Sequence, residues 1–147
     1  AKVIEYNCRF GDPETQVVLP LLETDIMDII EAVWEEKLDA LDIKWSDKSC
    51  ACVVMASGGY PEKYETGKVI SGLDENGQCE GAFVYHAGTK LEDGKFLTAG
   101  GRVLGITAYG DTLKEALDTA YKAVDTISFE KAHYRHDIGK KALSALK

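Results

Sequence analysis

Three polar residues at alternate positions near the start of the chain have the types and spacing of a metal and anion site. They are Glu5, Asn7 and Arg9. In an extended strand alternate side chains point to one face, so Glu5 and Asn7 would lie roughly 6.5–7 Å apart at Cα. A carboxylate and an amide oxygen suit a hard cation such as Mg²⁺, and the guanidinium of Arg9 suits two-point contact with a phosphate or carboxylate. The same pattern is typical of the solvated face of an edge strand, which is the interpretation that spacing alone favours.

Two glycine pairs, Gly58-Gly59 and Gly100-Gly101, are the next features that could serve a ligand. Paired glycines let a backbone approach another group closely, and Arg102, directly after the second pair, could add positive charge. Both pairs also fit tight turns between strands, which is the interpretation that the sequence alone favours. There is no G-x-x-x-x-G-K-[ST] phosphate loop. The three histidines, of which His86 ends a predicted strand, show no catalytic pairing, so we expect structural roles for them.

The composition is that of an acidic globular chain. Its 147 residues include 17 Lys and Arg against 25 Asp and Glu, which gives a formal net charge of −8 with the basic residues scattered among acids. Such a chain repels nucleic acid and anionic membranes, so neither is expected as a partner. The longest apolar runs are far shorter than the roughly 20 residues that span a bilayer. No segment has the basic start and apolar core of a signal peptide.

The four cysteines indicate neither a zinc site nor a disulfide framework. Cys50 and Cys52 form a C-x-C pair in an apolar run, with Cys8 and Cys79 far away in the sequence. Zinc is not expected without C-x-x-C spacing or a histidine at ligand distance. In a strand Cys50 and Cys52 would share one face as small hydrophobic side chains. Cytoplasmic residence is the expected localisation.

The first part of the chain, residues 1–45, has the pattern of one strand followed by helices. Residues 3–7 alternate and are rich in β-formers, which predicts a strand already under way where the sequence opens, and hence a truncated or processed chain. Asp12, followed by proline, favours the start of a helix that Pro20 interrupts. Apolar residues at helical spacing over residues 25–37 predict a second helix.

The second part, residues 46–147, changes to short strands and glycine turns before one long helix. The expected strands cover residues 50–56, 69–70, 82–86, 96–98 and 103–107. Asp111 is expected to cap the helix, whose apolar stripe runs from Leu113 to Ile127. The sequence therefore predicts an α+β chain in two parts, the second a small antiparallel β domain with one long helix packed on it.

The motifs of this chain, taken together, resemble one enzyme family. The matching strings are residues 4–16 (I-E-Y-N-C-R-F-G-D-P-E-T-Q), 56–61 (A-S-G-G-Y-P), 67–70 (G-K-V-I), 86–89 (H-A-G-T), 100–105 (G-G-R-V-L-G) and 134–139 (Y-R-H-D-I-G). They resemble the phosphoribosylamine–glycine ligases, also called glycinamide ribonucleotide synthetases, in the correct order over essentially the whole chain.

The resemblance implies an ATP-grasp ligase of purine biosynthesis that joins 5-phosphoribosylamine to glycine and cleaves ATP to ADP and phosphate. It implies that ATP, the co-substrate, first phosphorylates the glycine carboxylate, and that the amine of phosphoribosylamine then attacks the acyl phosphate. In that scheme the family's metal pair falls on Glu5 and Asn7, which would bind Mg²⁺ or Mn²⁺. Arg9 would contact phosphate or the glycine carboxylate, and Arg102 would reach the same cleft from the opposite side.

The resemblance also assigns the two parts. Residues 1–45 would be the last strand and linking helices of an ATP-grasp domain, and residues 46–147 a hybrid-motif-like C-terminal domain. We expect no ligase activity from the isolated chain, because the nucleotide pocket and the phosphoribosyl domain are not in these 147 residues. The alternatives are another ATP-grasp carboxylate–amine ligase and a non-catalytic β scaffold that binds a partner. For the scaffold, the open edge of the strand at residues 3–7 would invite pairing with another chain, including self-association.

Overall fold

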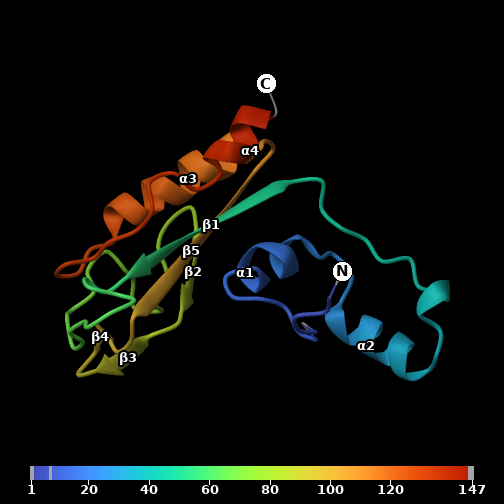
Figure 1. The fold of residues 1–147 in the computed structure, drawn as a ribbon, viewed down its shortest axis with the longest axis horizontal. Helices are drawn as coiled ribbons and strands as arrows, with labels where there is room; N and C mark the ends of the chain where they lie inside the picture. The colour runs from blue at the N-terminus through green and yellow to red at the C-terminus, as the bar shows by residue number, and fades with distance from the viewer. Residues whose placement is uncertain (1, 7, 146–147) are drawn as a thin grey trace.

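A three-stranded antiparallel sheet with one long helix on it forms the centre of the structure, a computed structural model that describes residues 2–6 and 8–145. The strands are β1 (Ser49–Ala56), β5 (Arg102–Gly110) and β2 (Phe83–His86), in the order β1-β5-β2, and the helix is α3 (Leu113–Thr126) (Figure 1). A two-stranded sheet of β3 (Thr89–Glu92) and β4 (Lys95–Thr98) adjoins it. The expected α+β class with antiparallel sheets is confirmed.

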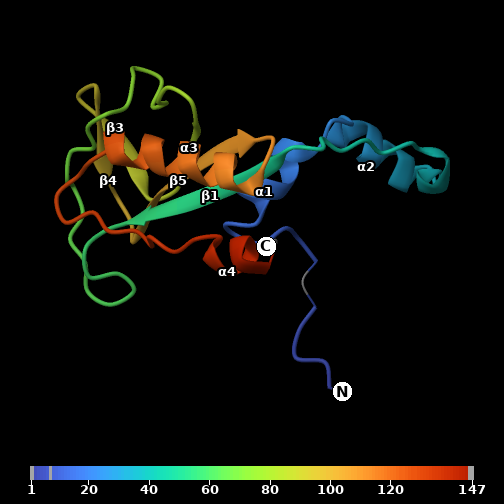
Figure 2. The ribbon, with the colours of Figure 1, turned by 90° about the horizontal axis from the view of Figure 1, so that it is seen from above.

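The core lies between α3 and one face of the sheet. Along β1 the residues Ala51, Val53 and Met55 are buried at alternate positions, as a strand with one face on a core requires. Their partners in β5 are Ala108, Ile106 and Leu104, which are also buried. Figure 2 shows α3 lying along these two strands. The stripe that the sequence predicted for the helix supplies its buried residues, Ala116, Leu117, Ala120, Ala123 and Val124.

The start of α3 is fixed by a capping box one residue later than expected. Thr112 Oγ1 accepts a hydrogen bond from Glu115 N at 3.2 Å, and Glu115 Oε2 accepts one from Thr112 N at 3.2 Å. Thr112 is therefore the cap and Asp111 is not, because only Thr112 has a glutamate three residues later to complete the reciprocal pair.

Helices cover the other face and the flanks of the sheet. The short α1 (Thr15–Val18) and the 3₁₀ turn η1 (Leu19–Leu21) pack against β1 and β5. After them come α2 (Ile26–Trp34) and the 3₁₀ turn η2 (Leu38–Ala40), which lie to one side of the sheet (Figure 1). The last helix, α4 (Lys140–Ala145), follows residues that pack on α3. Among the described residues no helix combines the length and the apolar character needed to cross a membrane.

Two helix predictions in the first part need adjustment. The side chain of Asp25 caps α2, accepting from Met27 N at 2.8 Å, but the helix ends at Trp34 rather than near Lys37. The cap of α1 is Glu14, which makes no side-chain capping hydrogen bond. Asp12, the expected cap, instead forms an ion pair with Arg102.

The strand predicted at residues 3–7 is wrong for residues 3–6, which belong to no strand and trail away from the sheet (Figure 2). Asn7 lies outside the described residues. Val3, Ile4 and Tyr6 are 69%, 97% and 82% exposed. A β pattern becomes a strand only where a second strand accepts its backbone hydrogen bonds, and the described chain offers none here. The expected pairing edge is therefore not formed, and self-association stays a prediction.

Two differences in the second part concern short strands. Residues 69–70 make only an isolated bridge between Val69 and Leu97 rather than a strand. The strand β3 was not predicted, because its alternating residues Thr89–Glu92 are mostly exposed and carry little apolar signal.

The burial of Leu104 in the central strand generates a stability prediction. Leu104 is 1% exposed between β1, β2 and α3, whereas Leu91 on β3 is 63% exposed. Leu104→Ala should lower the free energy of unfolding by about 2–5 kcal/mol, through lost burial and the cavity left behind. Leu91→Ala is the matched control and should stay within about 0.5 kcal/mol of the parent. Urea denaturation followed by circular dichroism measures both, and equal losses in the two variants would contradict this description of the core.

Candidate functional site

A cleft of about 1000 Å³ separates the first residues of the chain from the sheet. On one side it is lined by Glu5, Arg9 and Asp12, and on the other by Tyr85 of β2 and Arg102 of β5. Three of the four predicted site residues, Glu5, Arg9 and Arg102, therefore share one cleft. The fourth, Asn7, lies outside the described residues.

Arg102 occupies the first position of β5 and is held by Asp12. Its Nη2 atom lies 3.0 Å from Asp12 Oδ2, and its Nη1 donates to the backbone oxygen of Asp12 at 3.4 Å. The second carboxylate oxygen, Asp12 Oδ1, accepts from Gln16 Nε2 at 3.0 Å. The string F-G-D-P-E-T-Q contains both Asp12 and Gln16, but its residue types and spacing do not indicate the contact with Arg102.

A short hydrogen-bonded turn before α1 sets the position of Asp12. Gly11 N donates to Glu14 Oε2 at 3.0 Å, and the backbone N and Oγ1 of Thr15 both donate to Gly11 O, at 2.8 and 2.7 Å. These three bonds close the chain around Asp12. Local polar contacts within residues 11–15 therefore place the carboxylate that reaches Arg102.

Close backbone crossings fix the segment that carries Arg102. Gly88 N donates to Arg102 O at 2.9 Å, and a Cβ built on Gly88 would lie 2.6 Å from both Arg102 O and Gly100 Cα. A Cβ on Gly101 would lie 2.2 Å from the Tyr60 ring. The strings H-A-G-T, G-G-R and S-G-G-Y-P thus meet at one place. The described contacts of the pair Gly100-Gly101 are with other parts of this chain, which supports the interpretation as a packing and turn feature.

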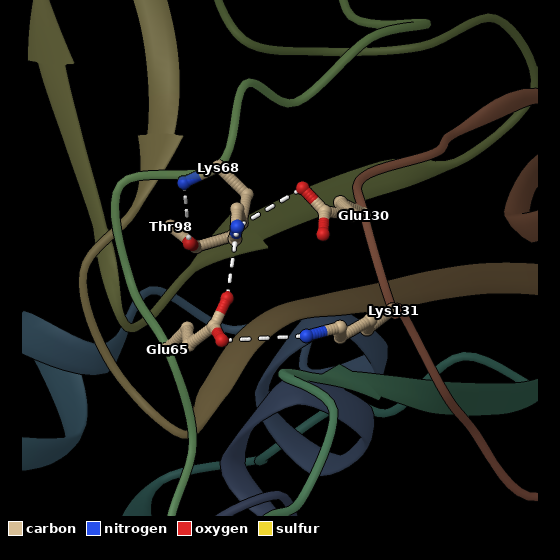
Figure 3. A network of polar contacts seen from close by, with 5 residues as sticks. All are labelled: Glu65, Lys68, Thr98, Glu130 and Lys131. Atoms are coloured by element: carbon tan, nitrogen blue, oxygen red, sulfur yellow. Dashed lines mark hydrogen bonds and ion pairs between the residues drawn. The ribbon is translucent and has the colours of Figure 1, made fainter.

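An ion-pair network holds the loop that carries Tyr60 (Figure 3). Lys68 Nζ lies 2.9 Å from both Glu65 Oε2 and Glu130 Oε2, and Lys131 Nζ lies 3.3 Å from Glu65 Oε1. The backbone N of Lys68 donates to the buried Thr98 Oγ1 at 3.0 Å. Hydrogen bonds from Lys68 first, and from Lys131, lower the pKa of Glu65, while Glu65 and Glu130 raise the pKa of Lys68. The network joins residues 65–68, Thr98 of β4 and residues 130–131.

His86 also lines the cleft, but both of its ring nitrogens have partners within the chain. Its Nε2 lies 2.9 Å from Gly77 O and its Nδ1 2.9 Å from Thr89 Oγ1. Since a carbonyl only accepts, we assign the proton to Nε2, which leaves Nδ1 as the acceptor for the Thr89 hydroxyl. This geometry agrees with the expected structural role of His86.

Cys50 and Cys52 share the sheet face opposite α3, as predicted. Their β5 partners are Tyr109 and Thr107, which alternate with the core-facing residues of that strand. Burial, followed by the charge of Cys52, raises the pKa of the Cys50 thiol to about 11. Burial also raises the pKa of Cys52, partly offset by a hydrogen bond with Thr107. Both side chains are therefore protonated packing groups near neutral pH.

The donor set fits part of a metal site. In the described ranges, 2–6 and 8–145, no three His, Cys, Asp or Glu side chains gather in a way that could hold a metal ion. Glu5 offers one carboxylate at the cleft. Because Mg²⁺ takes six oxygen ligands, the remaining ligands would have to come from Asn7, substrate, water or further polypeptide.

Comparison with known proteins matches nearly all of this chain. Residues 50–141 match the family model described as phosphoribosylglycinamide synthetase, C domain. The phosphoribosylamine–glycine ligase of Caldanaerobacter subterraneus is 56% identical over 137 residues, which is 93% of this chain and 32% of that protein. The ligase of the same name from Synechocystis is 52% identical over 143 residues, 97% of this chain and 34% of that protein.

A solved structure gives the same result for the fold. The crystal structure of phosphoribosylamine–glycine ligase from Thermotoga maritima superposes with a TM-score of 0.71 at 35% identity, covering 92% of this chain and 32% of that one. The chain thus spans about a third of the length of these relatives. The matches bear out the resemblance that the motifs indicated.

The raised pKa of Cys50 generates a prediction on thiol reactivity. Only the thiolate is alkylated, so the iodoacetamide rate at Cys50 should rise about tenfold per pH unit between pH 7 and 10 and level off near pH 11. The exposed Cys8 serves as an internal control and should be alkylated first near neutral pH. Peptide mass spectrometry after timed quenching measures each site separately. A Cys50 rate that is already constant above pH 9 would contradict the burial described for this thiol.

Proposed function

Since the chain belongs to the phosphoribosylglycinamide synthetase family through its C domain, we propose that it is the C-terminal part of an ATP-dependent ligase. That ligase would join 5-phosphoribosylamine and glycine to give glycinamide ribonucleotide, ADP and phosphate. The observation that carries the proposal is the cleft that Glu5 and Arg9 line together with Arg102, the first residue of β5. The resemblance assigns these three residues to the ligase site.

The proposal divides the chain at about residue 45. Residues 1–45 would complete an ATP-grasp domain, and residues 46–147 would form the C-terminal domain. The exposed apolar side chains of α2 support the division, since Trp34 is 88% exposed and Val33 56%. An apolar helix face of this kind belongs against further polypeptide. The strands and α3, by contrast, enclose a core of their own.

Chemically, the reaction requires that phosphate charge be neutralised and that water be kept from an acyl phosphate. Mg²⁺ or Mn²⁺, held by Glu5 and Asn7, would neutralise charge on the ATP phosphates. Arg9 and Arg102 would orient the phosphate or the glycine carboxylate through paired N–H donors. The isolated chain would be inactive, because a complete nucleotide site needs the rest of the ligase. Cytoplasmic residence stays a prediction.

A chimeric ligase tests the proposal. This chain would replace the segment that it matches in the Caldanaerobacter subterraneus ligase, where the two are 56% identical over 137 residues. We expect ADP release that depends on both glycine and phosphoribosylamine, and none from the 147-residue chain alone. In the chimera, Glu5→Ala with Asn7→Ala should lower turnover by about 100-fold, because a charge-stabilising group is lost.

The control variant is Glu75→Ala, a carboxylate in an exposed loop that does not line the cleft, and it should leave turnover unchanged. Normal turnover and magnesium dependence in the double variant would overturn the metal assignment. An inactive chimera that folds and binds ATP would overturn the assignment of this chain to the ligase.

A further inference from the structure

We propose that Asp12 is a positioning residue that holds the Arg102 guanidinium ready for an anionic group of the substrate, with Gln16 fixing Asp12 in turn. This inference rests on the proposed function and deepens it. It concerns two residues to which the motif comparison assigned no role. The chemical class of the ligand is a carboxylate or a phosphate.

Gln16, Asp12 and Arg102 form a continuous series of polar contacts along the wall of the cleft. Gln16 Nε2 donates to Asp12 Oδ1 at 3.0 Å, and Asp12 Oδ2 faces Arg102 Nη2 at 3.0 Å. The backbone oxygen of Asp12 adds a second contact to Arg102 Nη1 at 3.4 Å. Two contacts from a single residue, 90 positions away in the sequence, thus restrain the guanidinium.

The contacts leave much of the guanidinium available. It carries five N–H donors in a planar fork; Nη1 donates to the backbone oxygen of Asp12, and Nη2 forms an ion pair with the Asp12 carboxylate. The Arg102 side chain remains 43% exposed and lines the cleft. The remaining N–H donors are enough for two-point binding of a carboxylate or phosphate.

Stability is a poor explanation for this ion pair. Both partners are about half-exposed, and ion pairs of that kind contribute little to folding. Orientation is the better explanation, because an unrestrained arginine has many rotamers to lose when it binds a ligand. A guanidinium already held in place loses fewer, which strengthens binding. The negative charge of Asp12 also weakens the long-range attraction of Arg102 for an anion. The arrangement therefore favours a ligand that makes direct hydrogen bonds with Arg102.

Steady-state kinetics of the chimeric ligase test the substrate role. Asp12→Ala should raise KM for the substrate that Arg102 contacts by about tenfold, equivalent to about 1.4 kcal/mol, with kcat changed less than KM. Glycine, phosphoribosylamine and ATP are varied separately, so the affected substrate identifies a carboxylate or a phosphate ligand. Arg102→Ala should raise the same KM, and adding Asp12→Ala to it should have no further effect.

The matched control is Asp118→Ala, which removes another exposed aspartate that pairs with Lys114 far from the cleft. It should change none of the three KM values. A further KM rise when Asp12→Ala is added to Arg102→Ala, or unchanged KM values in Asp12→Ala alone, would overturn the proposal.

A second measurement on the 147-residue chain is independent of activity. Nitrogen-15 NMR reports rotation of the Arg102 guanidinium, which should be hindered in the parent, freer in Gln16→Leu and freest in Asp12→Ala. Equal mobility in the parent and Asp12→Ala would overturn the positioning role even in an active ligase. An inactive chimera would overturn the proposed function and the substrate role of Arg102, while NMR would still decide whether Asp12 holds the side chain.

Discussion

The candidate site depends on one packing contact, the docking of residues 10–21 on the sheet face opposite α3. Gly105 at the centre of β5 lies beneath this segment, since a Cβ built on it would be in ordinary contact with Gln16 Cγ at 4.0 Å. Tyr109 adds a hydrogen bond from its hydroxyl to Pro20 O at 3.3 Å, and Arg102 adds its contact with Asp12. A helix as short as α1 is not stable alone, so the sheet fixes the conformation of this segment.

The central position of β5 explains why the sheet can support a cleft. It pairs with β1 on one side and β2 on the other, and residues 103–108 are all buried. Arg102 is the last exposed residue before this buried run, so its backbone is anchored while its side chain remains accessible. The close approach of Gly88 to Arg102 O, and of the Tyr60 ring to Gly101, also restrain the start of β5. Arg102 is thus an accessible cation at the rigid start of β5.

Elements whose periodicity follows burial were predicted correctly from the sequence. Elements and contacts that depend on a partner distant in the sequence were not. The strand at residues 50–56 and the stripe of α3 were predicted because their buried side chains repeat every second or every third to fourth position. The strand at residues 3–7 was wrong for its described part because the pattern reveals no partner strand. Residue types and spacing pointed to Glu5, Arg9 and Arg102, and the family resemblance gave them their expected roles in one cleft. The contact of Asp12 with Arg102 could not be predicted, since no local pattern relates residues 90 positions apart.

One measurement tests most directly whether the first residues of the chain face Arg102 across a cleft. A spin label attached to the exposed Cys8 would broaden the NMR signals of nearby residues, and the other three cysteines are partly buried with a raised thiol pKa, which favours selective labelling. We expect stronger broadening at the amides of Arg102 and Tyr85 than at Ala120, on the opposite side of the sheet. Broadening that is equal at all three, or absent from Arg102, would contradict the docking on which the site depends.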